Sequence, residues 1–168
     1  MLFIKGDSMK YCSECGEKLI LKKDGIDGLV PFCPTCGQFR YPMSNIAVSA
    51  IIMQDDQILL IKQYGQDRNI LVAGYINYQE SAEEALKREI KEEVGLDVVS
   101  YEFNQSCYYE KSNTLMLNFV VRTKGEVIIN EEIDSFEWFD KKIVLDKIAP
   151  NSLAKHFVEL SIEKKLIK

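Results

Sequence analysis

Three glutamates near the middle of the chain have the spacing of a metal site. Glu89, Glu92 and Glu93 stand at positions i, i+3 and i+4, which places their carboxylates on one face of a helix, within one turn. Like charges this close repel one another, and a hard cation such as Mg²⁺, which prefers oxygen ligands, would relieve that repulsion. A solvated helix face paired with lysines or arginines is the alternative interpretation of the same residues.

A single helix between Ser81 and Gly95 is expected to present these carboxylates. Ser81 is a good N-cap, because its hydroxyl can accept a hydrogen bond from the first turn, and Glu84 completes a capping box. Gly95 follows the last turn, where a left-handed residue closes a helix. Apolar residues at helical spacing predict a buried stripe made of Ala82, Ala85, Leu86, Ile90 and Val94.

Four cysteines near the N-terminus form two C-x-x-C pairs separated by seventeen residues. They are Cys12, Cys15, Cys33 and Cys36. This spacing favours a structural zinc site with four thiolates, which would replace a core that the short segment cannot build. The alternatives are disulfides, which a reducing compartment disfavours, and a redox pair, which needs a thioredoxin-like context. Gly25 and Gly28 predict a hairpin tip between the pairs, and Cys107 is predicted to be a packed thiol.

The pattern after Pro42 predicts an α+β fold with a mixed sheet. The predicted strands are 46–53, 57–63, 70–73, 98–109, 114–123, 127–130 and 135–140. A helical turn is expected within 141–148, and Pro150 and Ser152 open a final helix with Leu153, Phe157 and Leu160 as its core stripe. The predicted domains are therefore a zinc ribbon over residues 9–41 and a larger domain over residues 44–168.

The composition describes an ordinary globular chain of 168 residues with a formal net charge of −5. No apolar run approaches the ~20 residues of a transmembrane helix, and the start lacks the apolar region of a secretory signal. A cytoplasmic protein is therefore expected, with Met9 considered beside Met1 as the natural start. Lysines and arginines form no cluster, which argues against a nucleic-acid-binding protein. His156, the single histidine, is predicted to be structural.

The surroundings of the acidic helix resemble the Nudix box. Gly74, five residues, Glu80, seven residues, and then REIxEExGL at residues 88–96 match that box at every defined position. The resemblance implies an α/β/α sandwich that hydrolyses a nucleoside diphosphate linked to another group. It implies that Arg88 and Glu80 orient the loop and the helix. The implied ligands of catalytic Mg²⁺ or Mn²⁺ are Glu89, Glu92 and Glu93, helped by the carbonyl of Gly74.

A cysteine ribbon directly before this box is similar to one Nudix subfamily, the NAD(H) pyrophosphatases. The similarity begins at Lys10 and continues through the segments IAVSAIIMQDDQILLI, LVAGY, EIDSFEWF and PNSLAKHFVE. By position, it implies that Glu132 acts beside the box carboxylates as a metal ligand and as the first candidate for the general base. The implied catalytic residues are Glu92, Glu93, Glu132 and Arg88. The predicted substrate-binding residues are Tyr75, Tyr78, Tyr108 and Tyr109, whose rings could stack on those of a dinucleotide.

One segment departs from that subfamily. Residues 104–116, NQSCYYEKSNTLM, lack the prolines and the tryptophan of the subfamily signature SQPWPFPxS. The leading hypothesis is a Mg²⁺- or Mn²⁺-dependent Nudix hydrolase that cleaves NADH or NAD to NMN(H) and AMP. The alternatives are an ADP-ribose or other nucleoside diphosphate-X pyrophosphatase and a non-catalytic nucleotide sensor. The expected partners are a nucleotide substrate, with NAD-capped RNA included, and a second copy in a homodimer.

Overall fold

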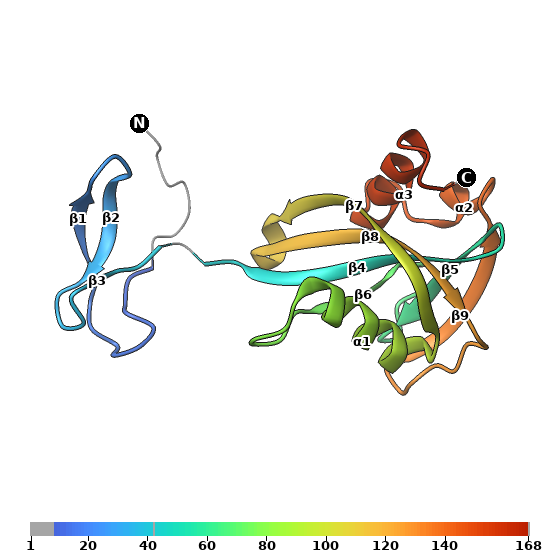
Figure 1. The fold of residues 1–168 in the computed structure, drawn as a ribbon, viewed down its shortest axis with the longest axis horizontal. Helices are drawn as coiled ribbons and strands as arrows, with labels where there is room; N and C mark the ends of the chain where they lie inside the picture. The colour runs from blue at the N-terminus through green and yellow to red at the C-terminus, as the bar shows by residue number, and fades with distance from the viewer. Residues whose placement is uncertain (1–8, 42, 168) are drawn as a thin grey trace. The chain divides into compact units, whose positions relative to one another are not determined.

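The computed structural model of the chain describes residues 9–41 and 43–167, and it divides into two compact units between Ser44 and Asn45 (Figure 1). Each unit has a sheet of its own. The segment before Met9 and the predicted boundary residue Pro42 lie outside the described residues. Among the described residues, no helix is both long enough and apolar enough to cross a lipid bilayer.

The smaller unit is a three-stranded antiparallel sheet. Its strands are β1 (Ile20–Asp24), β2 (Gly28–Cys33) and β3 (Gln38–Phe39), in the order β1-β2-β3. The predicted hairpin is confirmed, since Gly28 pairs with Asp24 and has a φ of 83°, which favours glycine. The buried residues among those described in this unit are Cys12, Val30, Pro31 and Cys33. Two of these four residues are cysteines, so apolar packing contributes little to this unit.

The larger unit is built on one mixed sheet. Its strands are β4 (Asn45–Gln54), β5 (Gln57–Gln63), β6 (Val72–Tyr75), β7 (Asp97–Tyr109), β8 (Thr114–Lys124) and β9 (Ile133–Asp140). They follow the order β7-β8-β4-β5-β9, and β6 pairs with β4 beside this path. The β4–β8 pair is parallel and the other pairs are antiparallel. The predicted α+β class with a mixed sheet is therefore confirmed.

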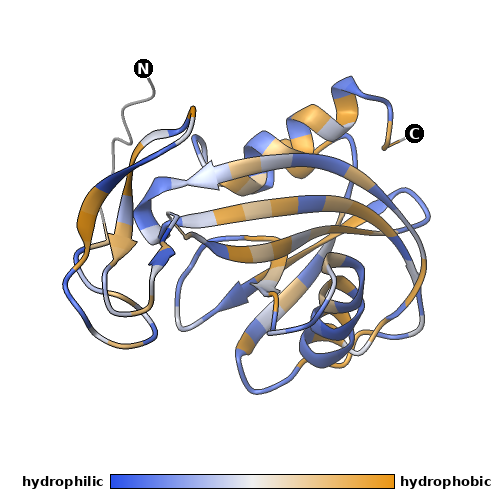
Figure 2. Ribbon diagram, turned by 60° about the vertical axis from the view of Figure 1, so that its left-hand side comes forward, coloured by the Kyte–Doolittle hydropathy of each residue, from blue (hydrophilic) through white to orange (hydrophobic). Residues whose placement is uncertain are grey.

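Helices cover both faces of this sheet (Figure 1). They are α1 (Ala82–Val94), α2 (Val144–Lys147) and α3 (Leu153–Glu163), with a short 3-10 helix η1 (Glu110–Ser112) after β7. Alternate residues of β4 serve the two faces, because side chains of a strand point to opposite sides. Val48, Ala50 and Ile52 pack with α1, whereas Ile51 and Met53 pack with α2 and α3. Both faces are thus apolar, and Figure 2 shows hydrophobic residues along the strands of this sheet. The predicted sandwich is confirmed.

One predicted strand is absent. Residues 127–130 form no strand, because their N–H groups serve the end of α1 instead: Ile128 donates to the carbonyl of Val94 at 3.0 Å, and Asn130 donates to that of Glu93 at 3.2 Å. These bonds satisfy carbonyls that the last turn of a helix leaves without partners. The predicted core stripe of α3 is confirmed in part: Phe157 is buried and Leu153 packs against the same apolar cluster, whereas Leu160 is half-buried and Val158 and Ser161 are buried beside Phe157.

Candidate active site and cysteine cluster

Helix α1 has the ends that the sequence predicts. The Ser81 side chain accepts from the N–H of Glu84, and the Glu84 side chain accepts from the N–H of Ser81, so the capping box is present. Gly95 closes the helix in the left-handed conformation, with a φ of 72°. Ala85, Leu86, Ile90 and Val94 are buried, and Ala82 is half-buried. Because this apolar side packs on the sheet, the orientation of the acidic side is set.

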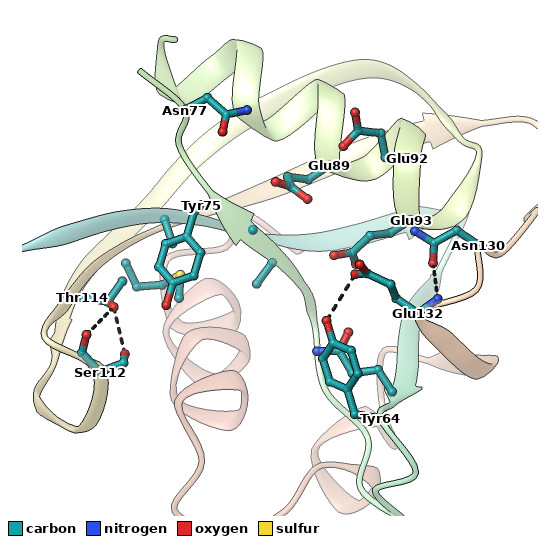
Figure 3. A pocket seen from close by; sticks show the side chains of 15 residues that line it. Tyr64, Tyr75, Asn77, Glu89, Glu92, Glu93, Ser112, Thr114, Asn130 and Glu132 are labelled. Carbon is teal, nitrogen blue, oxygen red and sulfur yellow. Dashed lines mark hydrogen bonds between the residues drawn. The ribbon is translucent and has the colours of Figure 1, made fainter. Parts of the chain in front are cut away.

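The acidic side of α1 faces a pocket of about 540 Å³. Glu89, Glu92 and Glu93 line it, together with Glu132 from the segment just before β9 (Figure 3). Gly74 and Tyr75 of β6 line it as well. The fold therefore gathers these residues from three separate parts of the sequence into one cavity that carries four carboxylates.

The carboxylate of Glu89 occupies the space that a Cβ atom would take at Gly74. A Cβ atom built at Gly74 would lie 1.9 Å from Cδ of Glu89 and 2.1 Å from its Oε1. Real Cβ atoms do not come that close to other heavy atoms, so a side chain at this position would displace Glu89. The first residue of the predicted box is thus a contact partner of the first predicted metal ligand.

Arg88 lies at the centre of the ion pairs behind the pocket. Its Nε and Nη2 atoms bind the two carboxylate oxygens of Glu80 at 2.7 and 2.9 Å, a bidentate pair. Its Nη1 atom binds Glu89 at 2.6 Å and Glu92 at 3.1 Å, and Nη2 also donates to the carbonyl of Tyr75 at 3.0 Å. The guanidinium thus joins the loop before α1 to two carboxylates of the pocket.

The same contacts explain the charge of Glu80. The Arg88 guanidinium and the N–H of Asn77, which donates to Glu80 at 2.8 Å, lower the pKa of Glu80 to about 2. Because Glu80 stays ionised at any ordinary pH, it keeps the guanidinium of Arg88 oriented. The pKa of Arg88 is raised, chiefly by Glu80.

Glu93 is the buried member of the carboxylate cluster. Glu93 is 6% exposed, and its Oε2 atom has no hydrogen-bond partner among the described residues. Burial first, and then the charges of Glu89, Glu132 and Glu92, raise the pKa of Glu93 to about 8. An ionised, buried carboxylate without a partner is strongly unfavourable unless a cation compensates it. The oxygen without a partner and the crowded carboxylates fit a divalent cation, which takes oxygen ligands.

Glu132 reaches the pocket through bonds made by three other residues. Its N–H donates to Oδ1 of Asn130 at 3.0 Å, and the N–H of Asn130 donates to the carbonyl of Glu93 at 3.2 Å. The hydroxyl of Tyr64 donates to Oε2 of Glu132 at 3.2 Å (Figure 3). Tyr64 and Asn130 also line the pocket, and sequence reasoning missed both. The only local signal for Tyr64 is the Tyr-Gly pair after a strand.

One of the four tyrosines predicted to bind substrate lies in this pocket. Tyr75 lines its other side, across from Glu132 and close to Ser112 and Thr114 (Figure 3). Tyr78 is 92% exposed and does not line the pocket. Tyr108 donates to Oδ1 of Asn113 at 2.8 Å, and Tyr109 lines a separate shallow hollow beside the start of α3. The structure therefore does not bring these three tyrosines together with the carboxylates.

The four cysteines of the smaller unit converge on one point. Their Sγ atoms all lie within 4.8 Å of one another, and all four are free thiols rather than disulfides. Three of the Sγ–Sγ distances are 3.3, 3.5 and 3.9 Å. Sulfurs bound tetrahedrally to zinc at about 2.3 Å would lie about 3.8 Å apart. The cluster therefore has the dimensions of a four-thiolate zinc site.

The pKa values of the cysteines also favour a bound cation. Nε of Arg40 donates to Sγ of Cys12 at 3.3 Å and lowers the pKa of that thiol to about 6. The thiols of Cys15 and Cys33 raise the pKa of Cys36 to about 12. Four thiolates therefore need a cation to coexist. The predicted zinc ribbon is consistent with all of these observations.

Gly16 and Gly37 form equivalent turns in the two C-x-x-C pairs. Each donates its N–H to the carbonyl of the first cysteine of its pair, Cys12 or Cys33, at 2.9 Å. Their φ values are 73° and 68°, a conformation that favours glycine. The two pairs are thus built as matching knuckles.

Comparison with known proteins agrees with this architecture. A solved Nudix hydrolase from Nitrosomonas europaea superposes with a TM-score of 0.68 at 21% identity, over 94% of this chain and 93% of that one. An ADP-ribose pyrophosphatase from Streptococcus suis superposes with a TM-score of 0.60 at 25% identity, over 73% of this chain and 92% of that one. The first likeness shows the fold alone.

Sequence relatives point to the same family. The NAD-capped RNA hydrolase NudC of Pseudomonas aeruginosa is 27% identical over 160 residues, which are 93% of this chain and 56% of that protein. The chain thus spans little more than half the length of this relative. The NUDIX domain family matches residues 43–159. The chain therefore belongs to the Nudix hydrolase family.

Proposed function

We propose that this protein is a divalent-metal-dependent Nudix pyrophosphatase that cleaves the diphosphate bridge of a dinucleotide such as NADH or NAD. The observation that carries the proposal is the pocket in which Glu89, Glu92, Glu93 and Glu132 meet beside Gly74. A pyrophosphate is anionic and so is this pocket. Cations held between the two would explain why an acidic surface binds an anionic substrate.

The proposed ligands of Mg²⁺ or Mn²⁺ are Glu89, Glu92, Glu93 and Glu132, with the carbonyl of Gly74. When bound, such ions neutralise charge on the phosphates and hold them in place. Arg88 does not contact the substrate in this scheme. It keeps Glu89 and Glu92 in position through the ion pairs at 2.6 and 3.1 Å.

Glu132 is proposed as the general base, with Glu92 or Glu93 as the alternatives. It would take a proton from a water molecule, whose oxygen forms a new bond to phosphorus while the bridging P–O bond breaks on the opposite side. General-base help of this kind is typically worth about 10²–10⁴-fold in rate. Glu132 suits the role because its carboxylate lines the pocket and is exposed, whereas Glu93 is buried.

The two sides of the pocket differ in a way that suits a dinucleotide. One side carries the four carboxylates, and the other carries Tyr75, Ser112 and Thr114, which are neutral. A diphosphate would occupy the first side through bound cations, and an uncharged ring would stack on Tyr75, since aromatic faces pair well. The name of the NudC relatives, NAD-capped RNA hydrolases, supports a substrate that contains NAD. Stacking by Tyr78, Tyr108 and Tyr109 stays a prediction.

The proposed role of the cysteine cluster is structural. Zinc bound by Cys12, Cys15, Cys33 and Cys36 has no open position for a substrate, which is typical of structural sites. We keep the homodimer as part of the proposal, with the ribbon as a candidate contact.

A panel of substrates would test this function. Purified protein with Mg²⁺ or Mn²⁺ would be incubated with NADH, NAD, ADP-ribose, diadenosine polyphosphates and NAD-capped RNA, and the products would be separated by chromatography. The proposal predicts NMN(H) and AMP from NADH or NAD. Hydrolysis of ADP-ribose alone would favour the second candidate, which the altered segment 104–116 supports. Turnover of none would leave a nucleotide sensor.

A further inference from the structure

A strained turn stands beside Glu132. Tyr64 and Gly65 follow β5 with φ values of 56° and 66°, and the N–H of Gln66 donates to the carbonyl of Gln63 at 3.2 Å. A tight turn with two left-handed central residues normally takes asparagine, aspartate or glycine at the first of them. For an aromatic residue this conformation is unfavourable, because Cβ approaches the following carbonyl oxygen. The tyrosine therefore needs a reason other than the turn itself.

Both central residues of this turn bind the segment that leads into β9. The Tyr64 hydroxyl donates to Oε2 of Glu132 at 3.2 Å, and the N–H of Gly65 donates to Oδ2 of Asp134 at 2.7 Å. Glu132 and Asp134 are two residues apart, so the turn holds this segment at two neighbouring points. The N–H of Gly65 holds the backbone of this segment through Asp134, and the phenol of Tyr64 holds Glu132, the carboxylate of this segment that lines the pocket.

Glu132 needs such a contact because its surroundings repel it. The carboxylates of Glu89, Glu92 and Glu93 line the same pocket, and Glu132 is exposed, so its side chain is free to turn toward water. A hydroxyl donor favours the orientation in which the carboxylate stays beside Glu93 (Figure 3). Strained residues persist where the surrounding structure and the function both require them.

We propose that Tyr64 is a positioning residue, whose phenol holds the carboxylate of Glu132 in the pocket, and that the left-handed tyrosine is retained for this purpose. The inference rests on the proposed function, in which Glu132 acts on the attacking water. It assigns a role to the turn after β5, outside the Nudix box. Tyr64 acts through Glu132 and has no chemical step of its own.

Three variants would test the inference. Tyr64→Phe keeps the ring and removes the hydroxyl. We expect kcat to fall about tenfold or more, since hydrogen bonds to charged groups are among the stronger ones, with KM changed by less than about twofold. Tyr64→Asn removes the phenol and suits the left-handed backbone, so kcat should fall as well while Tm rises by about 2 °C or more. Tyr101→Phe is the matched control, because Tyr101 lies on β7 outside the pocket. It should change neither kcat nor Tm.

The outcomes separate this inference from the proposed function. An inactive wild type would overturn the proposed function, and with it the role of Tyr64. An active wild type with unchanged kcat in Tyr64→Phe would overturn the role of Tyr64 alone. A raised KM with unchanged kcat would also overturn it, because it would indicate direct contact with the substrate. A fall in both kcat and Tm for Tyr64→Asn would show that the tyrosine stabilises the turn and would contradict the retained strain.

Discussion

The two units of this chain are stabilised in opposite ways. In the smaller unit, the described buried residues are Cys12, Val30, Pro31 and Cys33, and four Sγ atoms lie within 4.8 Å of one another. In the larger unit, two apolar clusters fill both faces of a six-stranded sheet. Zinc bound by thiolates would therefore hold the first unit together, whereas burial of apolar surface holds the second.

The two candidate metal sites differ in the same sense. The cysteine cluster offers four ligands at tetrahedral spacing, which closes the coordination of zinc. The acidic pocket offers carboxylates on one side of a cavity of about 540 Å³ and leaves space on the other. In the proposed function, the first site would hold its metal permanently and the second would share its metal with a ligand. Both sites offer four side-chain ligands. The type of ligand, and the space left beside the ligands for a substrate, therefore distinguish a structural metal site from a catalytic one.

Loss of zinc should have the largest effect, and it should affect one unit only. Cys33→Ser removes one thiolate, and structural zinc is worth about 10 kcal/mol or more in small domains. We expect the backbone NMR signals of residues 9–41 to collapse toward random-coil positions while those of residues 45–167 keep their dispersion. Cys107→Ser, outside the cluster, should leave both sets unchanged. Unaltered signals in Cys33→Ser would remove the proposed difference between the units.

Glu93→Gln should have the next largest effect, on catalysis rather than on folding. The substitution keeps the size of the side chain and removes the charge that would bind a cation. Turnover of the best substrate should fall about 10³-fold or more, equivalent to about 4 kcal/mol. Thermal melting would be measured on the same sample, and it should not fall, because the variant buries no charge. Activity within about threefold of the wild type would refute the ligand role of Glu93.

Ile52→Ala should destabilise the larger unit without weakening zinc binding by the smaller unit. Ile52 is fully buried between the sheet and α1, and removal of such a side chain typically destabilises by about 3 kcal/mol. Chemical denaturation followed by the fluorescence of Trp138, which packs against this core, would report it. Ile26→Ala, at a fully exposed position of the ribbon, is the control. Zinc release from Ile52→Ala at a denaturant concentration where the wild type retains zinc would show that the two units unfold together.

The last predicted effect is a dependence of stability on pH that belongs to the larger unit. The fold raises the pKa of Glu93 to about 8 from an ordinary value near 4.5, so the folded state binds this proton more tightly than the unfolded state. Without added divalent cations, the wild type should therefore lose stability relative to Glu93→Gln as pH rises from about 5 to 8. Denaturation midpoints at three pH values would measure this. Mg²⁺ should reduce the difference, and a gain of stability with rising pH would contradict the burial of Glu93.

Much of the fold was predictable because its signals are local. The capping box at Ser81, the left-handed Gly95 and the cysteine pairs each depend on a few neighbouring residues, and the structure confirms the helix ends. Residues 127–130 have the β-branched composition of a strand, yet their backbone partners are Glu93 and Val94 of a distant helix end. Composition carries no record of such partners, which is why that prediction is wrong.

The candidate site was predictable to the same extent and for the same reason. Glu89, Glu92 and Glu93 come from one helical turn, so their spacing places them together. The carboxylate of Glu132 enters the same pocket beside Tyr64, which is 68 positions away in the chain, and Asn130 links the neighbouring backbone to Glu93 of α1. Neither contact leaves a pattern in the sequence. The resemblance to the Nudix family identified Glu132 as a site residue, whereas the role of Tyr64 is visible only in the structure.

The parallel pairing of β4 with β8 has a consequence for how the chain reaches this structure. Ser49 of β4 lies opposite Asn118 of β8, 69 residues later, and the Asn118 amide donates to both the carbonyl and the hydroxyl of Ser49. A growing chain on the ribosome therefore holds β4, apolar on both faces, without its parallel neighbour until β8 has been made. Pairings of this range slow folding and expose surface that aggregates, whereas the cysteine ribbon can close as soon as Cys36 emerges. If folding during synthesis requires a chaperone, the larger unit is thus expected to be the part that requires it.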